Sequence, residues 1–156
     1  MDESSEIKTL LEQYKIYVDM ADKVSSRRAT ANQFFITMLV AELAIASFLV
    51  ERAKSSNFEP GVLAILSIFG IALCLIWGTL LRSYRQLNQG KYKVIHEMEK
   101  RLPFRCFDVE WEVLAKGRNS KVYLPLTIIE SAVPYALAVP FCLLLVMSFF
   151  LYRSAP

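Results

Sequence analysis

The sequence predicts an all-α membrane protein, with three transmembrane helices and a cytoplasmic helical bundle. Three observations predict this class. Of the 156 residues, 54% are hydrophobic and 21% are charged, which is too apolar for an ordinary soluble domain and too polar for a chain buried entirely in a membrane. Three apolar stretches each have the length of about 20 residues that one helical span requires. The second stretch continues without a proline into a polar helical extension.

Residues 1–30 are expected to form a cytoplasmic amphipathic helix. Residues suited to a helix contact recur there at alternating spacings of four and three, which places a narrow stripe on one helix face. The stripe consists of Ile7, Leu11, Tyr14, Val18, Ala21 and Ser25. A helix that lies on a membrane surface can carry a similar stripe. Packing in a bundle is favoured, because basic residues do not outnumber acidic ones here.

The first two spans are predicted to form an antiparallel hairpin. The first transmembrane helix covers residues 31–52, an external turn covers 53–60, and the second helix covers 61–102. At about 1.5 Å per residue the second helix would be roughly 60 Å long, so it would cross the bilayer and project well beyond it. Pro60 suits the first position of this helix, and Pro103 is expected to end it.

The polar extension of the second span is expected to pack on the N-terminal helix. It continues the alternation of four and three through Leu80, Tyr84, Leu87, Lys91, Val94 and Met98. Helices joined by an antiparallel hairpin lie side by side, so the two stripes would face each other. This pair of helices forms the predicted cytoplasmic bundle.

A third transmembrane helix is expected in the C-terminal part of the chain. Residues 103–125 form a cytoplasmic connection with a short helix and a turn, and 126–156 contain the start of a juxtamembrane helix and the third span. Thr127 and Glu130 have the spacing of a capping box, so we expect a helix to begin there. Two prolines inside the span are expected to bend it.

The basic residues predict the orientation in the membrane. Five of them precede the first span, two lie in the first turn, ten lie between the second and third spans, and one follows the third. The positive-inside rule therefore places the N-terminus and the long connection in the cytoplasm, and the hairpin turn and the C-terminus outside. The three cysteines lack the spacing of a metal site or a disulfide framework, which fits a reducing compartment.

Glu42 is the sharpest candidate for a functional residue, because it lies near the middle of the first span. A charged side chain at this depth costs about 2.5–3.5 kcal/mol, so we expect the carboxyl group to be protonated, paired or turned away from lipid. Two interpretations stay open. The carboxyl group lies near an ion or proton path or gate, or it hydrogen-bonds another helix and stabilises an assembly. The second is favoured, since no relay partner accompanies it.

Two further sets of residues are candidates for contacts. Small residues that lie four apart in the second span allow close helix approach, which makes Gly70, Cys74 and Gly78 candidates for an oligomer or pore contact. The second set would form a cytoplasmic surface for a protein partner or for lipid headgroups: Tyr84, Arg85, Asn88, Lys91 and Glu99. Trp77 is expected at the headgroup interface. His96, the only histidine, is expected to serve packing.

The sequence contains no motif of catalysis. It has no Gly-rich phosphate loop, no zinc-binding helix motif and no nucleophile in a recognisable setting with His and Asp. We therefore expect no enzyme, no cofactor and no metal. Nucleic acid is not an expected partner, because the net charge is only +3 and the aromatic residues are not interleaved with a basic face.

Several blocks of the sequence resemble a known family. These blocks are Tyr14-x-x-Tyr17-Val18, Trp77-x-x-Leu80-x-x-x-Tyr84-Arg85-x-Leu87-Asn88-x-x-Lys91, Glu99-x-x-Leu102-Pro103, Glu110-Trp111-x-x-Leu114-x-x-Gly117 and Tyr123-x-x-Leu126-Thr127-x-x-Glu130. They are similar to blocks of the RipA-type octameric family of small bacterial membrane proteins. The resemblance implies a homo-oligomer, an octamer, in the inner (cytoplasmic) membrane of a bacterium, with no assigned catalysis.

The front half of the chain also resembles two-span effector modules of bacterial conflict systems, which are thought to perforate membranes. The third span departs from that pattern, and no sensor domain is appended. Two functions follow as expectations. The first is a structural or regulatory homo-oligomer with a cytoplasmic partner-binding surface. The alternative is an oligomeric channel or pore with Glu42 near its path or gate.

Overall fold

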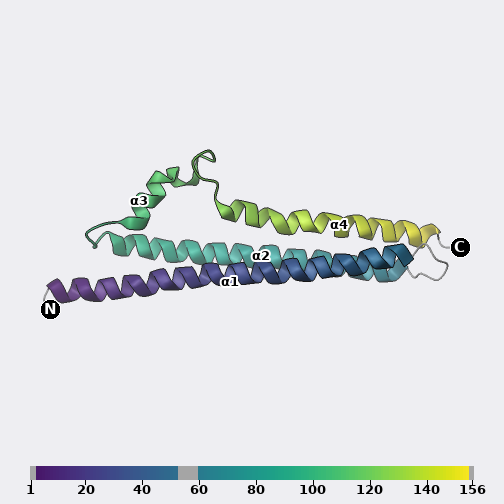
Figure 1. Cartoon of the computed structure of the whole chain (residues 1–156), viewed down its shortest axis with the longest axis horizontal. Coiled ribbons are helices and arrows are strands. Elements are labelled where there is room, and N and C mark those ends of the chain that lie inside the picture. The colour runs from purple at the N-terminus through teal and green to yellow at the C-terminus, as the bar shows by residue number, and fades with distance from the viewer. Residues whose placement is uncertain (1–2, 53–59, 155–156) are drawn as a thin grey trace. The chain divides into compact units, whose positions relative to one another are not determined.

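The computed structural model describes residues 3–52 and 60–154 of the chain. These residues form four α-helices and one short 3-10 turn, and no strand occurs among them. The elements in chain order are α1 (Glu3–Arg52), α2 (Pro60–Glu99), α3 (Cys106–Val113), η1 (Ala115–Gly117) and α4 (Leu126–Ser154), as Figure 1 shows. The all-α class that the sequence predicts is therefore confirmed.

Three helices, α1, α2 and α4, are long and apolar enough to cross a membrane. The candidate spans lie within Ser5–Arg52, Gly61–Glu99 and Leu126–Arg153. This agrees with the three spans expected from the sequence. The expected turn over 53–60 lies outside the described residues, apart from Pro60, which is the first residue of α2.

One continuous helix, α1, joins the two elements expected over residues 1–30 and 31–52. The sequence explains this continuity, since no proline or glycine occurs in α1 to interrupt its hydrogen bonds. Near the end of the first expected element, Ser25 is helical and its hydroxyl group donates a hydrogen bond of 3.3 Å to the Ala21 carbonyl. The amphipathic part and the apolar part of α1 are therefore segments of a single helix.

The chain divides into two compact units, and α1, α2 and α4 each contribute to both. The polar unit consists of Met1–Ala29 and Arg82–Ile129, and the span unit consists of Thr30–Leu81 and Glu130–Pro156. Each unit is described below by its own contacts.

The core of the span unit is built around an aromatic pair. The rings of Phe35 and Trp77 are nearly parallel, with an interplanar angle of 7° and centroids 5.8 Å apart. The indole Nε1 of Trp77 donates a hydrogen bond of 2.9 Å to Oδ1 of Asn32. The other buried residues of this core are Leu39, Cys74, Leu81 and Phe141. Only 1% of Trp77 is exposed, so its side chain packs inside the span unit, and its expected position at the depth of the headgroups stays a prediction.

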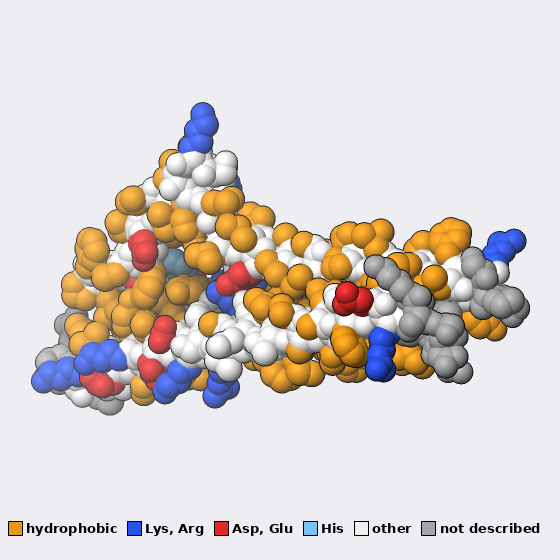
Figure 2. Space-filling view, turned by 45° about the vertical axis from the view of Figure 1, so that its right-hand side comes forward, with side chains coloured by type: hydrophobic (Ala, Val, Ile, Leu, Met, Phe, Trp, Pro, Cys, Tyr) orange, Lys and Arg blue, Asp and Glu red, His pale blue; other side chains and the backbone are white. Residues whose placement is uncertain are grey.

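The outer faces of the span unit are apolar. Large hydrophobic side chains are exposed on all three of its helices, among them Val40, Ile45, Phe48, Ile65, Leu75, Leu143 and Phe149. Figure 2 shows hydrophobic side chains as the main kind visible along α4, while Lys and Arg side chains gather over the N-terminal part of α1. Exposed apolar surface of this extent suits contact with lipid or with another protein chain.

The polar unit packs the N-terminal part of α1 against the C-terminal part of α2. Ala21 and Val24 of α1 and Ile95 of α2 are buried in this unit. The ammonium group of Lys91 lies over the ring of Tyr17, 5.5 Å from its centroid. The packing of these two segments, which the matching stripes predict, is confirmed, and Figure 1 shows them side by side.

The connection between α2 and α4 covers residues 100–125 and is ordered by local hydrogen bonds. A turn ends α2, in which the N–H of Leu102 donates to the Glu99 carbonyl over 3.1 Å. The short helix α3 and the turn η1 follow, as expected for this region. The next helix, α4, begins at Leu126, so a helix begins where the spacing of Thr127 and Glu130 predicts one. In its first turn the N–H of Ile128 donates a hydrogen bond of 2.9 Å to the Pro125 carbonyl.

Candidate functional sites at two buried carboxyl groups

The carboxyl group of Glu99 joins three helices of the polar unit. Glu99 is the last residue of α2, and its side chain is fully buried. Its Oε1 accepts hydrogen bonds of 2.9 Å from the Tyr14 hydroxyl group and from the Phe107 N–H. Its Oε2 accepts a hydrogen bond of 3.1 Å from the Asp108 N–H. Three donors therefore satisfy this buried acceptor, as burial of a charged group requires.

Glu99 also caps α3 from outside that helix. The residue at the N-cap of α3, Arg105, makes no capping hydrogen bond with its side chain. The first N–H groups of a helix lack partners within the helix, and Phe107 and Asp108 supply two of them. The Glu99 carboxylate accepts both, and its negative charge lies at the positive end of the helix dipole. It therefore holds the start of α3 at the end of α2.

Aromatic packing completes the attachment of α3. The Phe107 ring lies 6.4 Å from the Tyr14 ring of α1 and 5.7 Å from the Tyr92 ring of α2, measured between centroids. Burial raises the pKa of the Tyr14 phenol, and the hydrogen bond to Glu99 and the charge of Glu99 raise it further. Tyr14 therefore acts as a neutral donor to a carboxylate over the usual range of pH.

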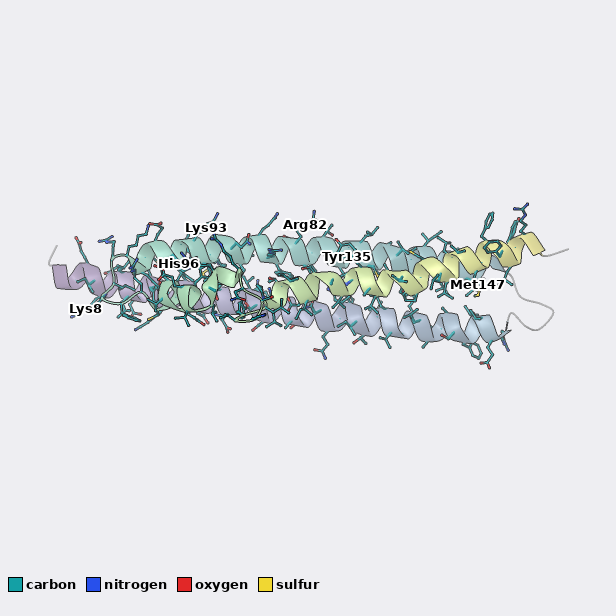
Figure 3. All side chains as sticks on the ribbon, turned by 90° about the horizontal axis from the view of Figure 1, so that it is seen from above. Lys8, Arg82, Lys93, His96, Tyr135 and Met147 are labelled. Carbon is teal, nitrogen blue, oxygen red and sulfur yellow. The ribbon has the colours of Figure 1, made fainter. Side chains whose placement is uncertain are left out.

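His96 lies on α2 beside α3, where Figure 3 labels it. Its Nδ1 is 3.8 Å from Oε2 of Glu99 and 3.7 Å from Oδ1 of Asp108, too far for a hydrogen bond. This nitrogen is buried and has no hydrogen-bond partner among the described residues. In the described part of the chain no group of three His, Cys, Asp or Glu side chains could hold a metal ion.

The residues expected to form a cytoplasmic surface have different environments. Arg85 is exposed, while Tyr84, Asn88 and Lys91 are partly buried. The expectation that Glu99 belongs to this surface is not met, because the side chain is buried in the polar unit. The physical reason is that the turn after α2 folds α3 back onto the end of that helix, which covers the carboxylate.

Glu42 is buried within the span unit, with only 6% of its surface exposed. Neither of its carboxyl oxygens has a hydrogen-bond partner among the described residues. The side chain is thus turned inward, one of the three outcomes expected for a carboxyl group in a span. Among residues 3–52 and 60–154, Glu42 makes no hydrogen bond to another helix.

The small residues of the second span lie against α4 of the same chain. A Cβ atom on Gly70 would come within 2.4 Å of the Phe141 ring, so only glycine fits there. Cys74 is buried, and Gly78 faces Tyr135 of α4, which Figure 3 labels. Close helix approach at these residues agrees with the expectation, but the approaching helix is α4. The predicted use of this stripe between subunits is not available where α4 covers it.

The sequence alone did not reveal the partners of Glu99. Two signals pointed toward them: Tyr14 belongs to the apolar stripe of α1, and Glu99 lies just before the predicted helix end at Pro103. Neither signal indicates the position of α3, which supplies two of the three donors through backbone N–H groups. Backbone donors have no sequence signature, so this site could be recognised only in three dimensions.

The chain was compared with known proteins. The model of the 8xMP family, described as an octameric membrane protein family, matches residues 11–150 and so spans parts of both units. No curated protein and no solved structure matches the chain.

Proposed function

Because the chain belongs to the octameric membrane protein family 8xMP, we propose that it functions as a homo-octamer of structural or regulatory role in the bacterial inner membrane. In this proposal the polar unit faces the cytoplasm and binds a protein partner, and no catalysis takes place. The RipA-type resemblance of the sequence blocks favours the same assignment. The observation that carries the proposal is the attachment of α3 by Glu99.

The attachment of α3 supports a docking role, because it gives the exposed side of this helix a defined orientation. Val109 and Val113 lie four residues apart on α3 and are exposed, Val113 to 72%. The acidic Glu110 and Glu112 are exposed beside them. Apolar side chains rimmed by charged ones are typical of protein–protein interfaces. Burying a carboxylate costs free energy of desolvation even when three donors bind it. A role that requires a fixed position of α3 would explain why the chain has such a group here.

The assembly is tested by the mass of the purified protein. The full chain is extracted in a mild detergent, and the protein mass of the complex is measured by native mass spectrometry. We expect a species with eight copies of the 17.8 kDa chain. A monomer as the main species at all detergent and protein concentrations would contradict the proposed octamer.

The partner surface is tested by recovery from bacterial membranes. The wild type, a Val109→Ser/Val113→Ser variant and an Ile16→Ser control, which changes an exposed apolar residue of α1 in the same unit, are tagged and cross-linked in cells. We expect a specific cross-linked protein with the wild type and the control, and its loss with the α3 variant. Equal recovery from all three would reject α3 as the docking surface. An α3 variant that no longer forms octamers would assign this face to the subunit contact instead.

A channel is the second candidate, and Glu42 favours it. A buried carboxyl group in a span with two unpartnered oxygens is a common feature of ion and proton paths. The test is conductance in planar bilayers of the wild type, Glu42→Gln and the control Glu51→Gln, since Glu51 is exposed near the end of α1. If Glu42 lines a channel, the cation selectivity of Glu42→Gln should differ from that of the wild type, and the selectivity of Glu51→Gln should not. Absence of current from all three proteins would remove this candidate.

A further inference from the structure

The connection that leads into α4 carries three basic side chains followed by apolar ones. Lys116, Arg118 and Lys121 are exposed, and no acidic residue occurs between Val113 and Ile129. Val122 and Leu124, which follow the basic residues, are also exposed, to 54% and 46%. We call residues 116–124 the basic connection. Its side chains combine positive charge with apolar area that nothing in the polar unit covers.

The backbone of the basic connection is held in a defined conformation. Ala115, Lys116 and Gly117 have positive φ values of 51°, 53° and 65°, in the left-handed region that side chains other than glycine rarely adopt. Such strain persists only where the surrounding structure enforces it. Here the position that a Cβ on Gly117 would take is 3.3 Å from both the Trp111 ring and Pro125, so this turn is packed tightly.

Local hydrogen bonds fix the rest of the basic connection. The N–H of Arg118 donates to the Ala115 carbonyl over 3.0 Å. Asn119 accepts from the Lys121 N–H through its side-chain oxygen, over 3.1 Å, and from the Val122 N–H through its carbonyl, over 3.0 Å. The three basic side chains therefore project from an ordered turn, which reduces the entropy that binding an anion would cost.

The length of α4 is compatible with a position of this turn at the membrane surface. With 29 residues at about 1.5 Å each, α4 is about 43 Å long, which matches a bilayer of about 40–45 Å including its headgroups. With the whole of α4 across the bilayer, Leu126, its first residue, would lie at the depth of the headgroups. Leu124 precedes it by two residues, so the basic connection would begin where the phosphates of the lipids lie.

We propose that the basic connection binds the headgroups of anionic phospholipids. Lys116, Arg118 and Lys121 contact lipid phosphates, and Val122 and Leu124 lie at the boundary between headgroups and acyl chains. The charge is complementary, and the apolar side chains distinguish a lipid from a free anion. Lys116 is available for this role, because its 3.9 Å contact with Glu112 is between exposed groups and weak.

This inference differs from the positive-inside rule and does not depend on the proposed octamer or its partner. The rule concerns how many basic residues lie on one side of the membrane, wherever they stand. The proposal assigns binding to three particular side chains on one ordered turn. Removing the same number of positive charges elsewhere in the polar unit therefore serves as the matched control.

The first test measures lipid binding to the full chain in detergent by native mass spectrometry. The probes are phosphatidylglycerol and phosphatidylcholine with the same acyl chains. The test variant is Lys116→Gln/Arg118→Gln/Lys121→Gln, and the control is Lys8→Gln/Lys15→Gln/Lys93→Gln, which changes exposed residues of the same unit. We expect the wild type and the control to prefer phosphatidylglycerol, and the test variant to bind it between about tenfold and 100-fold more weakly.

Each other outcome of this test overturns the proposal. Equal binding of the two lipids by the wild type would mean that the headgroup charge is not recognised. An equal loss in the test and control variants would mean that only the total charge matters. If inorganic phosphate displaced phosphatidylglycerol and Val122→Ser/Leu124→Ser bound it unchanged, the turn would be a site for free anions and not for lipids.

A second test uses Trp111 as a reporter, since its ring packs beside Gly117 in the basic connection. In vesicles that contain phosphatidylglycerol, the Trp77→Phe protein has Trp111 as its single tryptophan. We expect lipids with a spin label on the headgroup to quench Trp111 more strongly than lipids labelled deep in the acyl chain. No quenching by either label, or stronger quenching by the deep label, would place the turn away from the headgroups.

Discussion

At the scale of single residues, the buried Glu99 shows how a charge can organise a small helical unit. Its three donors come from the side chain of Tyr14 and from the backbone of two residues of α3. Hydrogen bonds to a charged group contribute about 1.5–3 kcal/mol, roughly twice as much as bonds between neutral groups. The position of α3 therefore depends strongly on one carboxylate.

The substitution Glu99→Gln should loosen α3. The glutamine keeps one acceptor oxygen, but its NH2 group replaces the other. This NH2 group is a donor, so it cannot accept the N–H of Phe107 or Asp108 that it would face. We expect a loss of about 2 kcal/mol in the local stability of α3, and hence roughly 30-fold faster amide hydrogen exchange there.

Glu97→Gln provides the matched control for Glu99→Gln. Glu97 lies two residues away on α2, is exposed, and pairs with Lys100 over 2.7 Å at the surface. Such a surface pair contributes little, so exchange in α3 should stay near that of the wild type. Equal exchange rates in both variants would show that the Glu99 carboxylate does not hold α3.

Tyr14 makes the stability of the polar unit depend on alkaline pH. Its pKa is raised in the folded chain by burial and by Glu99, whereas an unfolded tyrosine has a pKa of about 10. Below that value both states hold the proton and the full stabilisation is present. As the pH rises above about 10, the unfolded state loses the proton first, so stability falls until the folded pKa is reached.

The measurement for Tyr14 is thermal unfolding between pH 9 and 11, compared with Tyr14→Phe. The wild type should lose more stability over this range than the variant, because phenylalanine cannot ionise. Burial also raises the pKa of Tyr92, but that residue is present in both proteins and its effect cancels in the difference. Parallel curves for the two proteins would mean that Tyr14 is not coupled to folding.

At the scale of elements, the contact between α2 and α4 depends on the absence of a side chain at Gly70. A Cβ atom there would overlap the Phe141 ring, which is fully buried in the core of the span unit. Overpacking of this kind typically costs 1–3 kcal/mol, since a dense core cannot move aside freely. Glycine at this position thus sets the distance between the two helices.

The substitution Gly70→Ala should therefore lower the thermal stability of the protein in detergent. Gly90→Ala is the control, because nothing lies within 4 Å of its added Cβ and alanine is the better helix former by about 1 kcal/mol. We expect the two changes to have opposite signs. Combining Gly70→Ala with Phe141→Leu should recover part of the loss, and a Gly70→Ala protein as stable as the wild type would contradict the contact.

At the scale of the whole molecule, the predicted orientation can be tested with a natural cysteine. Cys106 is exposed at the start of α3, whereas Cys74 and Cys142 lie in helices that are candidate spans. A maleimide that cannot cross membranes should label Cys106 only after the cytoplasmic side is opened. Labelling of intact spheroplasts that disappears in Cys106→Ser would reverse the orientation.

The number and apolar character of the candidate spans were predictable from the sequence. Helix-forming stretches of about 20 apolar residues, an uninterrupted polar extension and matched stripes are local patterns, and they depend on backbone hydrogen bonds within each helix. The sequence did not show whether the helix is interrupted or continuous between the first two expected elements. A junction of polar residues without proline or glycine is compatible with both.

The tertiary structure alone decided which residues meet. Glu99 looked like part of a surface, Trp77 like an interface residue, and the small stripe like a contact between subunits, because each assignment used only the residue and its place along one helix. Their actual neighbours are backbone N–H groups of α3, the ring of Phe35 and the helix α4. The Phe35 ring and α4 stand far along the chain from their partners, and the α3 N–H groups lie beyond the turn that ends α2. Each pairing therefore depends on how the helices fold back on each other, which no local pattern encodes.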